Sequence, residues 1–253
     1  MDQRLPYHLR RLDTPVHRLD PRTKLILTLA FAVLVVSTPP ARLPAFVGYA
    51  GLLSWATAIA GIPLAFVVVR AAAVLPFSVL AALWMPFLHD GPAVELWGGT
   101  VRLSVAGLWV LSGVVIKSFL GASAAVLLAT TTPFHELAGG LRKLGVPVIL
   151  VDTLTLTYRY LFVLMEESAR LRRAAAARGY RPRWLGQALL IGRLIGQLFM
   201  HSYERAERVY GAMLLRGYRG QMPTSRELAW GKVDVAALVI LLPALLAVRT
   251  WLR

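Results

Sequence analysis

Residues 105–130 read VAGLWVLSGVVIKSFLGASAAVLLAT, an apolar run long enough to cross a bilayer as one helix. A helix needs roughly 20 residues to cross about 30 Å of hydrocarbon. The single charged side chain of the run, Lys117, lies near its middle, where a cation costs at least about 2.5 kcal/mol unless it is paired or hydrated. We therefore expect Lys117 to be a structural residue that faces other helices, in preference to a residue on a transport pathway.

Four further apolar runs predict membrane helices, at residues 25–38, 43–60, 71–88 and 235–248. The first run is short, but Arg22 and Lys24 can extend their stems along the lipid and keep their charges in the headgroups. A helix that begins at Pro21 is therefore long enough. We expect Pro76 and Pro86 to be tolerated inside the third helix, as prolines often are in membrane helices.

The link before residue 105 has a different pattern. Alternating residues flank Gly98 and Gly99 there, and Asp90, Gly91 and Pro92 precede them. Alternation around a Gly-Gly pair is typical of a tight β-hairpin. We expect this hairpin to cap the outer face of the membrane helices.

The composition agrees with a membrane protein and argues against other classes. Of 253 residues, 57% are hydrophobic and 16% are charged, and 28 basic side chains outnumber 13 acidic ones to give a net charge of +15. A nucleic-acid binder could account for the charge but rarely for so much apolar surface. The chain has no cysteine, which excludes a disulfide scaffold, a thiolate metal site and a cysteine nucleophile.

The basic residues gather in two segments, which predicts the topology. Residues 1–24 carry six of them and residues 131–232 carry sixteen, whereas the outer links carry Arg42 and Arg102 alone. By the positive-inside rule both basic segments are cytoplasmic, so that an even number of crossings separates them. The N-terminal segment is too polar for a cleavable signal peptide, and we treat it as part of the mature protein.

These observations predict an all-α polytopic protein of the cell membrane, with about five transmembrane helices and long cytoplasmic helices. The predicted divisions are a cytoplasmic N-terminal segment, transmembrane helices 1–4, a cytoplasmic coupling domain and a last transmembrane helix, at residues 1–24, 25–130, 131–232 and 233–253. A further apolar stretch, 146–164, contains Asp152 and Arg159. If it crossed the membrane, the arginine-rich segment after it would lie outside, so we expect a helix in or under the inner leaflet.

Three helices are predicted within 131–232 by their stop signals. The first follows Pro133, is amphipathic and ends at Gly145; the second spans 166–178 and the third 185–216. Glu204 and Arg208 are spaced to pair on the third helix.

The second and third helices end in the same sequence, 38 residues apart: Ala174-x-x-x-Arg178-Gly179-Tyr180-Arg181 and Ala212-x-x-x-Arg216-Gly217-Tyr218-Arg219. A glycine with φ > 0 followed by a turn is a common helix cap, and an arginine near it opposes the helix dipole. Capping alone explains one copy. It does not require the Tyr-Arg that follows each glycine, so the pair favours two arginines that dock into acidic grooves of a partner protein.

Several motifs, taken in order, resemble the transmembrane T component of energy-coupling factor (ECF) transporters. They are 19–25 (LDPRTKL), Thr131-Thr132-Pro133, Tyr158-Arg159-Tyr160 and the doubled Arg-Gly ends, and the stretch 202–220 is most similar to the cobalt (CbiQ) branch. The resemblance covers essentially the whole chain.

The resemblance implies the partners and the docking residues. A T component joins a membrane S component, here a metal-binding CbiM-like one, to two ABC-type ATPase subunits, and a small accessory membrane subunit is a further expected partner. Two Ala-Arg-Gly motifs dock into the ATPases. Here they correspond to Ala177, Arg178 and Gly179 and to Leu215, Arg216 and Gly217, with leucine in place of the second alanine.

The sequence predicts no catalytic residue, cofactor or metal site in this chain. It has no Gly-x-x-x-x-Gly-Lys-Ser/Thr motif for ATP, and its histidines are far apart, at His8, His17, His89, His135 and His201. The basic segments suit a lipid bilayer better than nucleic acid. A self-contained secondary carrier is the rival function, but only Lys117 is an ionisable residue inside the first four predicted spans. The substrate stays open between cobalt, nickel and a vitamin.

Overall fold

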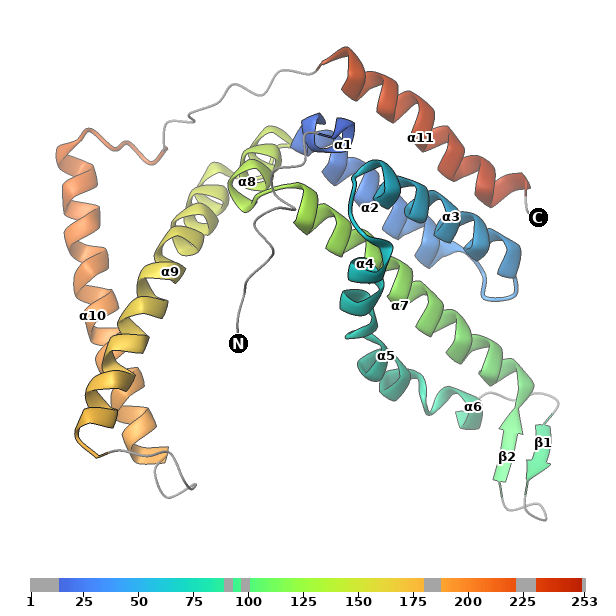
Figure 1. Cartoon of the computed structure of the whole chain (residues 1–253), viewed down its shortest axis with the longest axis horizontal. Helices are drawn as coiled ribbons and strands as arrows, with labels where there is room; N and C mark the ends of the chain where they lie inside the picture. The colour runs from blue at the N-terminus through green and yellow to red at the C-terminus, as the bar shows by residue number, and fades with distance from the viewer. Residues whose placement is uncertain (1–13, 89–92, 97–100, 180–187, 222–230, 252–253) are drawn as a thin grey trace. The chain divides into compact units, whose positions relative to one another are not determined.

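The computed structural model describes residues 14–88, 93–96, 101–179, 188–221 and 231–251 (Figure 1). In this described part the chain is helical apart from one two-stranded hairpin, which confirms the predicted all-α class. The contacts divide the chain into a first unit, Met1–Gly140 with Leu228–Arg253, and a second, Leu141–Glu227. Some predicted features lie outside the described residues, namely Arg4, His8, Arg10, Arg11, His89, Asp90, Gly91, Pro92, Gly98, Gly99, Tyr180, Arg181 and the predicted helix start at residue 185.

The first unit is built on a helix bundle. Its members are α2 (Pro21–Ser37), α3 (Leu43–Ile59), α7 (Val105–Thr131) and α11 (Lys232–Trp251), preceded by the short α1 (Pro15–Arg18). Helix α2 packs against α7 and α11, and α3 packs against the same two helices (Figure 1). The predicted helices at 25–38, 43–60, 105–130 and 235–248 are therefore confirmed as helices.

The core of the bundle is apolar and mostly aliphatic. Phe31 of α2 meets Tyr49 of α3 edge to face, with ring centroids 5.8 Å apart. Burying an aromatic pair in this geometry contributes about 1 kcal/mol beyond the area that it removes from solvent. The other buried members are Leu34, Val35, Ala45, Phe46, Leu120, Ala124 and Leu245.

The predicted third helix, 71–88, is wrong in its bounds and in its continuity. The chain forms three short helices instead, α4 (Leu64–Ala72), α5 (Leu75–Ala82) and α6 (Met85–Leu88), and each packs along α7 (Figure 1). Helix α4 begins directly after Pro63, so that Arg70 lies inside it.

Two prolines explain the breaks. Helix α4 ends at Ala72, four residues before Pro76, and α5 ends at Ala82, four residues before Pro86. Proline has no backbone N–H to donate, and its ring clashes with the carbonyl of the fourth residue before it. Each proline is therefore the second residue of a new helix, and the axes of α4 and α5 differ by 42°.

The predicted hairpin is confirmed. Strand β1 (Ala93–Leu96) pairs antiparallel with β2 (Val101–Ser104), and Leu96 lies opposite Val101. Ser104 then caps α7, because its hydroxyl accepts a hydrogen bond from the backbone N–H of Gly107. That the hairpin lies at the outer face stays a prediction.

Lys117 of α7 forms a hydrogen bond with helix α2 inside the bundle. Its Nζ donates a hydrogen bond of 2.9 Å to the carbonyl oxygen of Val36, in the last turn of α2. The last four carbonyls of a helix have no partner inside the helix, and a cation there is favourable to the helix dipole. The contact shows that Lys117 faces a neighbouring helix, as expected; that it has no place on a transport pathway stays a prediction.

The first unit places two helix ends together. Lys24 Nζ, at the beginning of α2, donates to the carbonyl oxygen of Thr131, the last residue of α7, over 3.2 Å. The beginning of α2 and the end of α7 therefore lie on the same side of the bundle, as an even number of crossings requires.

Apolar side chains cover the outside of the helices as well as their core. Large hydrophobic side chains that are more than half exposed include Leu29, Val36, Val47, Val69, Phe77 and Trp84. An apolar surface of this extent is unfavourable in water and expected in lipid.

Among the described residues, two helices are long and apolar enough to cross a membrane, α7 and α9 (Val148–Ala177). If the bent pair of α4 and α5 forms one span, the number of such spans is three. The chain is a multi-pass membrane protein. Because α9 satisfies the same criteria, the prediction that 146–164 does not cross stays a prediction.

The second unit contains two long helices, α9 and α10 (Ala188–Leu215), and α8 (Phe134–Lys143) precedes them. The predicted amphipathic helix after Pro133 is confirmed, and Gly145 turns the chain with a φ of 93°. The predicted separation of 146–164 from 166–178 is wrong, because α9 is one continuous helix. Neither glycine nor proline occurs between residues 148 and 177, so nothing in the backbone stops the helix.

Candidate docking site at two helix ends

The end of α9 has the predicted capped geometry. The N–H of Arg178 donates to the carbonyl oxygens of Ala174 at 3.3 Å and Ala175 at 3.1 Å, and the N–H of Gly179 donates to Ala176 at 3.0 Å. Gly179 has a φ of 83°, which only glycine adopts without strain. The helix therefore stops at Arg178 and leaves its side chain at the tip.

The end of α10 repeats this geometry. The N–H of Arg216 donates to Ala212 at 3.3 Å and Met213 at 3.1 Å, and the N–H of Gly217 donates to Leu214 at 3.0 Å. Gly217 has a φ of 82°. The repeated sequence thus folds into the same structure twice, and the left-handed glycine predicted at each end is confirmed.

Both ends are accessible to a partner. Ala177, Arg178 and Arg216 are exposed, and Leu215 is 91% exposed. Neither guanidinium forms an ion pair with any other described residue. Because Leu215 stands where the first end has Ala177, the second tip carries the larger apolar surface beside its arginine.

The backbone at the end of α10 forms one more capping hydrogen bond after Gly217. The N–H of Tyr218 donates to the carbonyl oxygen of Met213 at 3.0 Å. This bond, together with the positive φ of Gly217, is the pattern of a Schellman cap. The equivalent Tyr180 lies outside the described residues.

Alanine at either capping glycine is expected to weaken docking. An added Cβ would meet nothing within 4 Å at Gly179 or Gly217, so the cost is conformational, about 1–2 kcal/mol for a non-glycine residue with this φ. We expect Gly179→Ala and Gly217→Ala each to lower the affinity for the partner about 5- to 30-fold, measured by titration of the purified chain.

Asparagine tolerates the left-handed conformation, so Gly179→Asn should retain most of the affinity. Gly192→Ala, in the interior of α10 with equally open space around it, is the control and should leave binding unchanged. Equal binding by Gly179→Ala, Gly217→Ala and the original chain would show that the capped geometry is not needed.

The two long helices are joined by a cluster of charged side chains that sequence reasoning missed. Glu167 of α9 pairs with His201 of α10, with Oε1 and Nδ1 3.4 Å apart. Arg170 donates a hydrogen bond to the same carboxylate, which lowers the pKa of Glu167 from its usual value. The sequence by itself assigned no role to His201, and the pairing could not be predicted because 34 residues separate the partners.

Helices α9 and α10 run antiparallel. Ala175 and Ala176, near the end of α9, line an apolar groove together with Ile191 and Leu194, near the beginning of α10. The 28 residues of α10 then carry the chain about 42 Å away at 1.5 Å per residue. The two arginine-bearing ends therefore lie at opposite ends of one helix pair, as α9 and α10 show in Figure 1.

Helix α9 is also tied to α8. Arg142 lies 4.0 Å from the carboxylate of Asp152, which is buried. Asp152 is one of the two charged residues of the apolar stretch 146–164, and Arg159, the other, is exposed. The pair accounts for one buried charge in this stretch without any transport role.

The family profile described as cobalt transport protein (CbiQ) matches residues 13–226, which include both helix ends. The chain belongs to the CbiQ family. Its resemblance to the T component of ECF transporters is thereby confirmed.

Relatives of this CbiQ-family chain have related names. It is 30% identical to the cobalt transport protein CbiQ of Rhodobacter capsulatus over 79% of this chain and 78% of that protein. It is 28% identical to the energy-coupling factor transporter transmembrane protein EcfT of Listeria innocua over 94% of each. It is 32% identical to the nickel permease LarQ of Lactiplantibacillus plantarum over 58% of each. The substrate differs among these names.

No group of three histidine, aspartate or glutamate side chains comes together as a metal site in the described part of this CbiQ-family chain. The docking residues that the resemblance implies, in contrast, occupy two matched and exposed positions. The helix ends are therefore the candidate functional site.

Proposed function

We propose that this T component couples ATP hydrolysis by two ABC-type ATPase subunits to cobalt uptake through a metal-binding, CbiM-like membrane S component. The observation that carries the proposal is the pair of matched, exposed, arginine-bearing ends of α9 and α10. The cobalt assignment is supported by the family description and by the Rhodobacter capsulatus relative. A small accessory membrane subunit and the surrounding lipid are the other proposed partners.

The chemistry of the two tips suits an acidic groove. A guanidinium is planar, permanently charged and able to donate two parallel hydrogen bonds to a carboxylate. At both tips the arginine side chain leaves the helix directly before the glycine at which the backbone turns. Arg178 and Arg216 can therefore enter a groove with their capping glycines close to its rim.

The mechanism is mechanical. When ATP closes the two ATPase subunits, their grooves change separation, and the two helix ends seated in them move relative to each other. Because α9 and α10 are 30 and 28 residues long and joined through Glu167 and His201, this motion is carried over the length of the pair. The result is a rigid-body movement of the hinge and shear kind that tilts the S component.

The location that fits this function is the cell membrane, with the N-terminus and residues 131–232 in the cytoplasm, where ATP is available. The charge bias of the sequence supports this orientation. A reporter fused after residue 253 should then be accessible from outside the cell, and one fused before residue 1 from inside.

Nickel is the second candidate substrate. The observation that favours it is the similarity to a nickel permease, although that similarity covers a smaller part of the chain than the similarity to CbiQ. The EcfT relatives leave a shared role with vitamin-specific S components as a third candidate.

Two measurements test the proposal. The purified chain should capture its ATPase subunits, and cells that co-express it with its neighbouring genes should take up labelled Co²⁺ in an ATP-dependent manner. Uptake of labelled Ni²⁺ in place of Co²⁺ would contradict the cobalt assignment. Uptake by the chain alone, without ATPase subunits, would instead show a self-contained carrier.

A further inference from the structure

One buried carboxylate joins the beginnings of two helices that are far apart in the sequence. Asp234 Oδ1 accepts a hydrogen bond of 2.7 Å from the N–H of Asp20, the residue before α2. Its Oδ2 accepts one of 2.9 Å from the N–H of Gly231, the residue before α11. Asp20 in turn accepts from the N–H of Arg22 at 2.8 Å. The N-termini of α2 and α11 therefore share Asp234.

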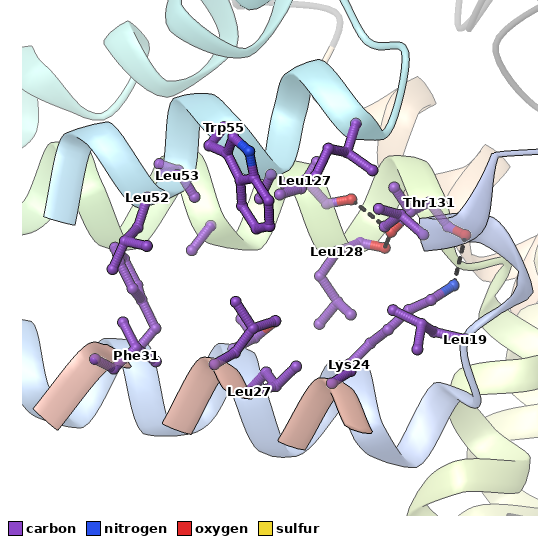
Figure 2. A pocket seen from close by; sticks show the side chains of 18 of the residues that line it. Leu19, Lys24, Leu27, Phe31, Leu52, Leu53, Trp55, Leu127, Leu128 and Thr131 are labelled. Atoms are coloured by element: carbon purple, nitrogen blue, oxygen red, sulfur yellow. Dashed lines mark hydrogen bonds between the residues drawn. The ribbon is translucent and has the colours of Figure 1, made fainter. Parts of the chain in front are cut away.

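Lys24 ties the end of α7 to the same place. Its Nζ donates to the carbonyl oxygens of Thr131 at 3.2 Å and His17 at 3.4 Å. Figure 2 shows its stem along an apolar cavity of about 400 Å³ and its nitrogen turned toward Thr131. Asp20, Lys24 and Asp234 are each less than a tenth exposed. We call these three residues the anchor.

Residues next to the anchor contact the helix that follows α7. Thr131 is two residues before Pro133, where the chain turns into α8. In α8, a Cβ added at Gly140 would lie 3.2 Å from Leu25 Cδ1 and 3.4 Å from Pro21 Cβ, so this glycine lets α8 pack closely on the first turn of α2. Helix α8 is thus held against the first turn of α2, beside the anchor, both by its short chain connection to α7 and by packing at Gly140.

Stability is a weak explanation for such a group. Buried ion pairs are often matched or exceeded in stability by apolar residues of the same size, because the cost of removing charges from water offsets their attraction. What hydrogen-bonded charges do specify is one geometry. Here that geometry joins three helix ends, of α2, α7 and α11, to the beginning of the segment that carries the docking ends.

We propose that the anchor transmits movement of α8 to the membrane helices, and that Lys24 is a positioning residue for this coupling. The inference rests on the proposed function and assigns a role to two sequence motifs, 19–25 and 131–133, that docking alone does not use. When α8 moves, the shared contacts make α2, α7 and α11 move as one body.

The test uses the whole complex with its ATPase and S components, reconstituted in liposomes, with labelled Co²⁺ as the probe. Lys24→Met removes the ammonium and keeps the length of the stem. We expect assembly and ATP hydrolysis within about twofold of the original complex, and Co²⁺ uptake per ATP lower by about tenfold. Lys24→Arg, which keeps the charge, should retain most of the uptake.

Lys117→Met is the matched control, because Lys117 also donates to a backbone carbonyl at a helix end, that of Val36, at the other end of α2. It should leave uptake per ATP unchanged. Equal loss in both variants, or normal coupling in Lys24→Met, would overturn the proposal.

If Lys24→Met does not fold, uptake per ATP can be measured in Asp234→Asn instead, because this variant keeps the acceptor Oδ1. Failure of both variants to fold would assign the anchor to folding alone. Failure of the original chain to bind ATPase subunits would instead contradict the proposed function.

Discussion

Alanine at both Arg178 and Arg216 is expected to abolish stable assembly of the chain with its ATPase subunits. Both side chains are exposed at capped helix tips, so the change removes charge without disturbing the fold. Truncating one partner of a buried, hydrogen-bonded charge pair at an interface costs about 2–5 kcal/mol. Each single variant should therefore weaken binding at least about 30-fold, and the double variant should lose co-purification and ATP-driven uptake together.

The control is Arg173→Ala, which removes an exposed arginine from the same helix α9, before its tip. It should bind the ATPase subunits as the original chain does, because an exposed charge away from the contact changes affinity little. Titration of the detergent-solubilised chain with the ATPase subunits gives the Kd of the original chain and of each variant. Normal assembly and uptake in the double variant would rule out docking through these ends.

Alanine at Gly107 is expected to destabilise the membrane bundle severely. A Cβ at this position would lie 2.5 Å from the carbonyl oxygen of Met85 and 2.5 Å from the Cα of Pro86. Both are backbone atoms, which cannot rotate away as a side chain could. Overpacking of this kind costs about 3 kcal/mol, and α6 would have to leave α7. We expect a large loss of monodisperse protein and a lower Tm in detergent.

Gly121→Ala is the matched control, since Gly121 lies in the same helix α7 and an added Cβ there meets nothing within 4 Å. Its effect should stay within about 1 kcal/mol, the usual difference between glycine and alanine in a helix. If both variants unfold at the same temperature, the close approach of α6 to α7 at Gly107 is not present in the protein.

Features that depend on neighbouring residues were predictable. The start of α2 at Pro21, the stop at Gly145 and the left-handed glycines 179 and 217 each follow from the backbone preferences of one or two residues. The β-hairpin and the Glu204–Arg208 pair, with 3.8 Å between charged atoms, follow from period and spacing. Local rules were misapplied in two places. Pro76 and Pro86 were expected inside one helix, whereas each is the second residue of a new helix. The stretch 146–164 was separated from 166–178, whereas α9 is continuous.

The candidate site was predicted in part. Both helix ends, with Arg178, Gly179, Arg216 and Gly217, were found from the repeat, because capping is a local property that the sequence repeats. Ala177 and Leu215 were added by the family resemblance, and docking through these six residues stays a proposal. Their placement at opposite ends of an antiparallel pair was not, since it depends on packing of α9 against α10 and on Glu167 and His201.

By itself, the sequence determined that this is a helical membrane protein, where most of its helices end, and which two arginines lie at matched tips. Only the tertiary structure decided that Asp234 serves two helices, that Lys24 holds the end of α7, and that α8 packs on α2 at Gly140. The reason is physical. A cap or a turn is decided by the dihedral angles of a few neighbouring residues, whereas a shared carboxylate requires two segments 214 residues apart to meet, and that distance has no local signal.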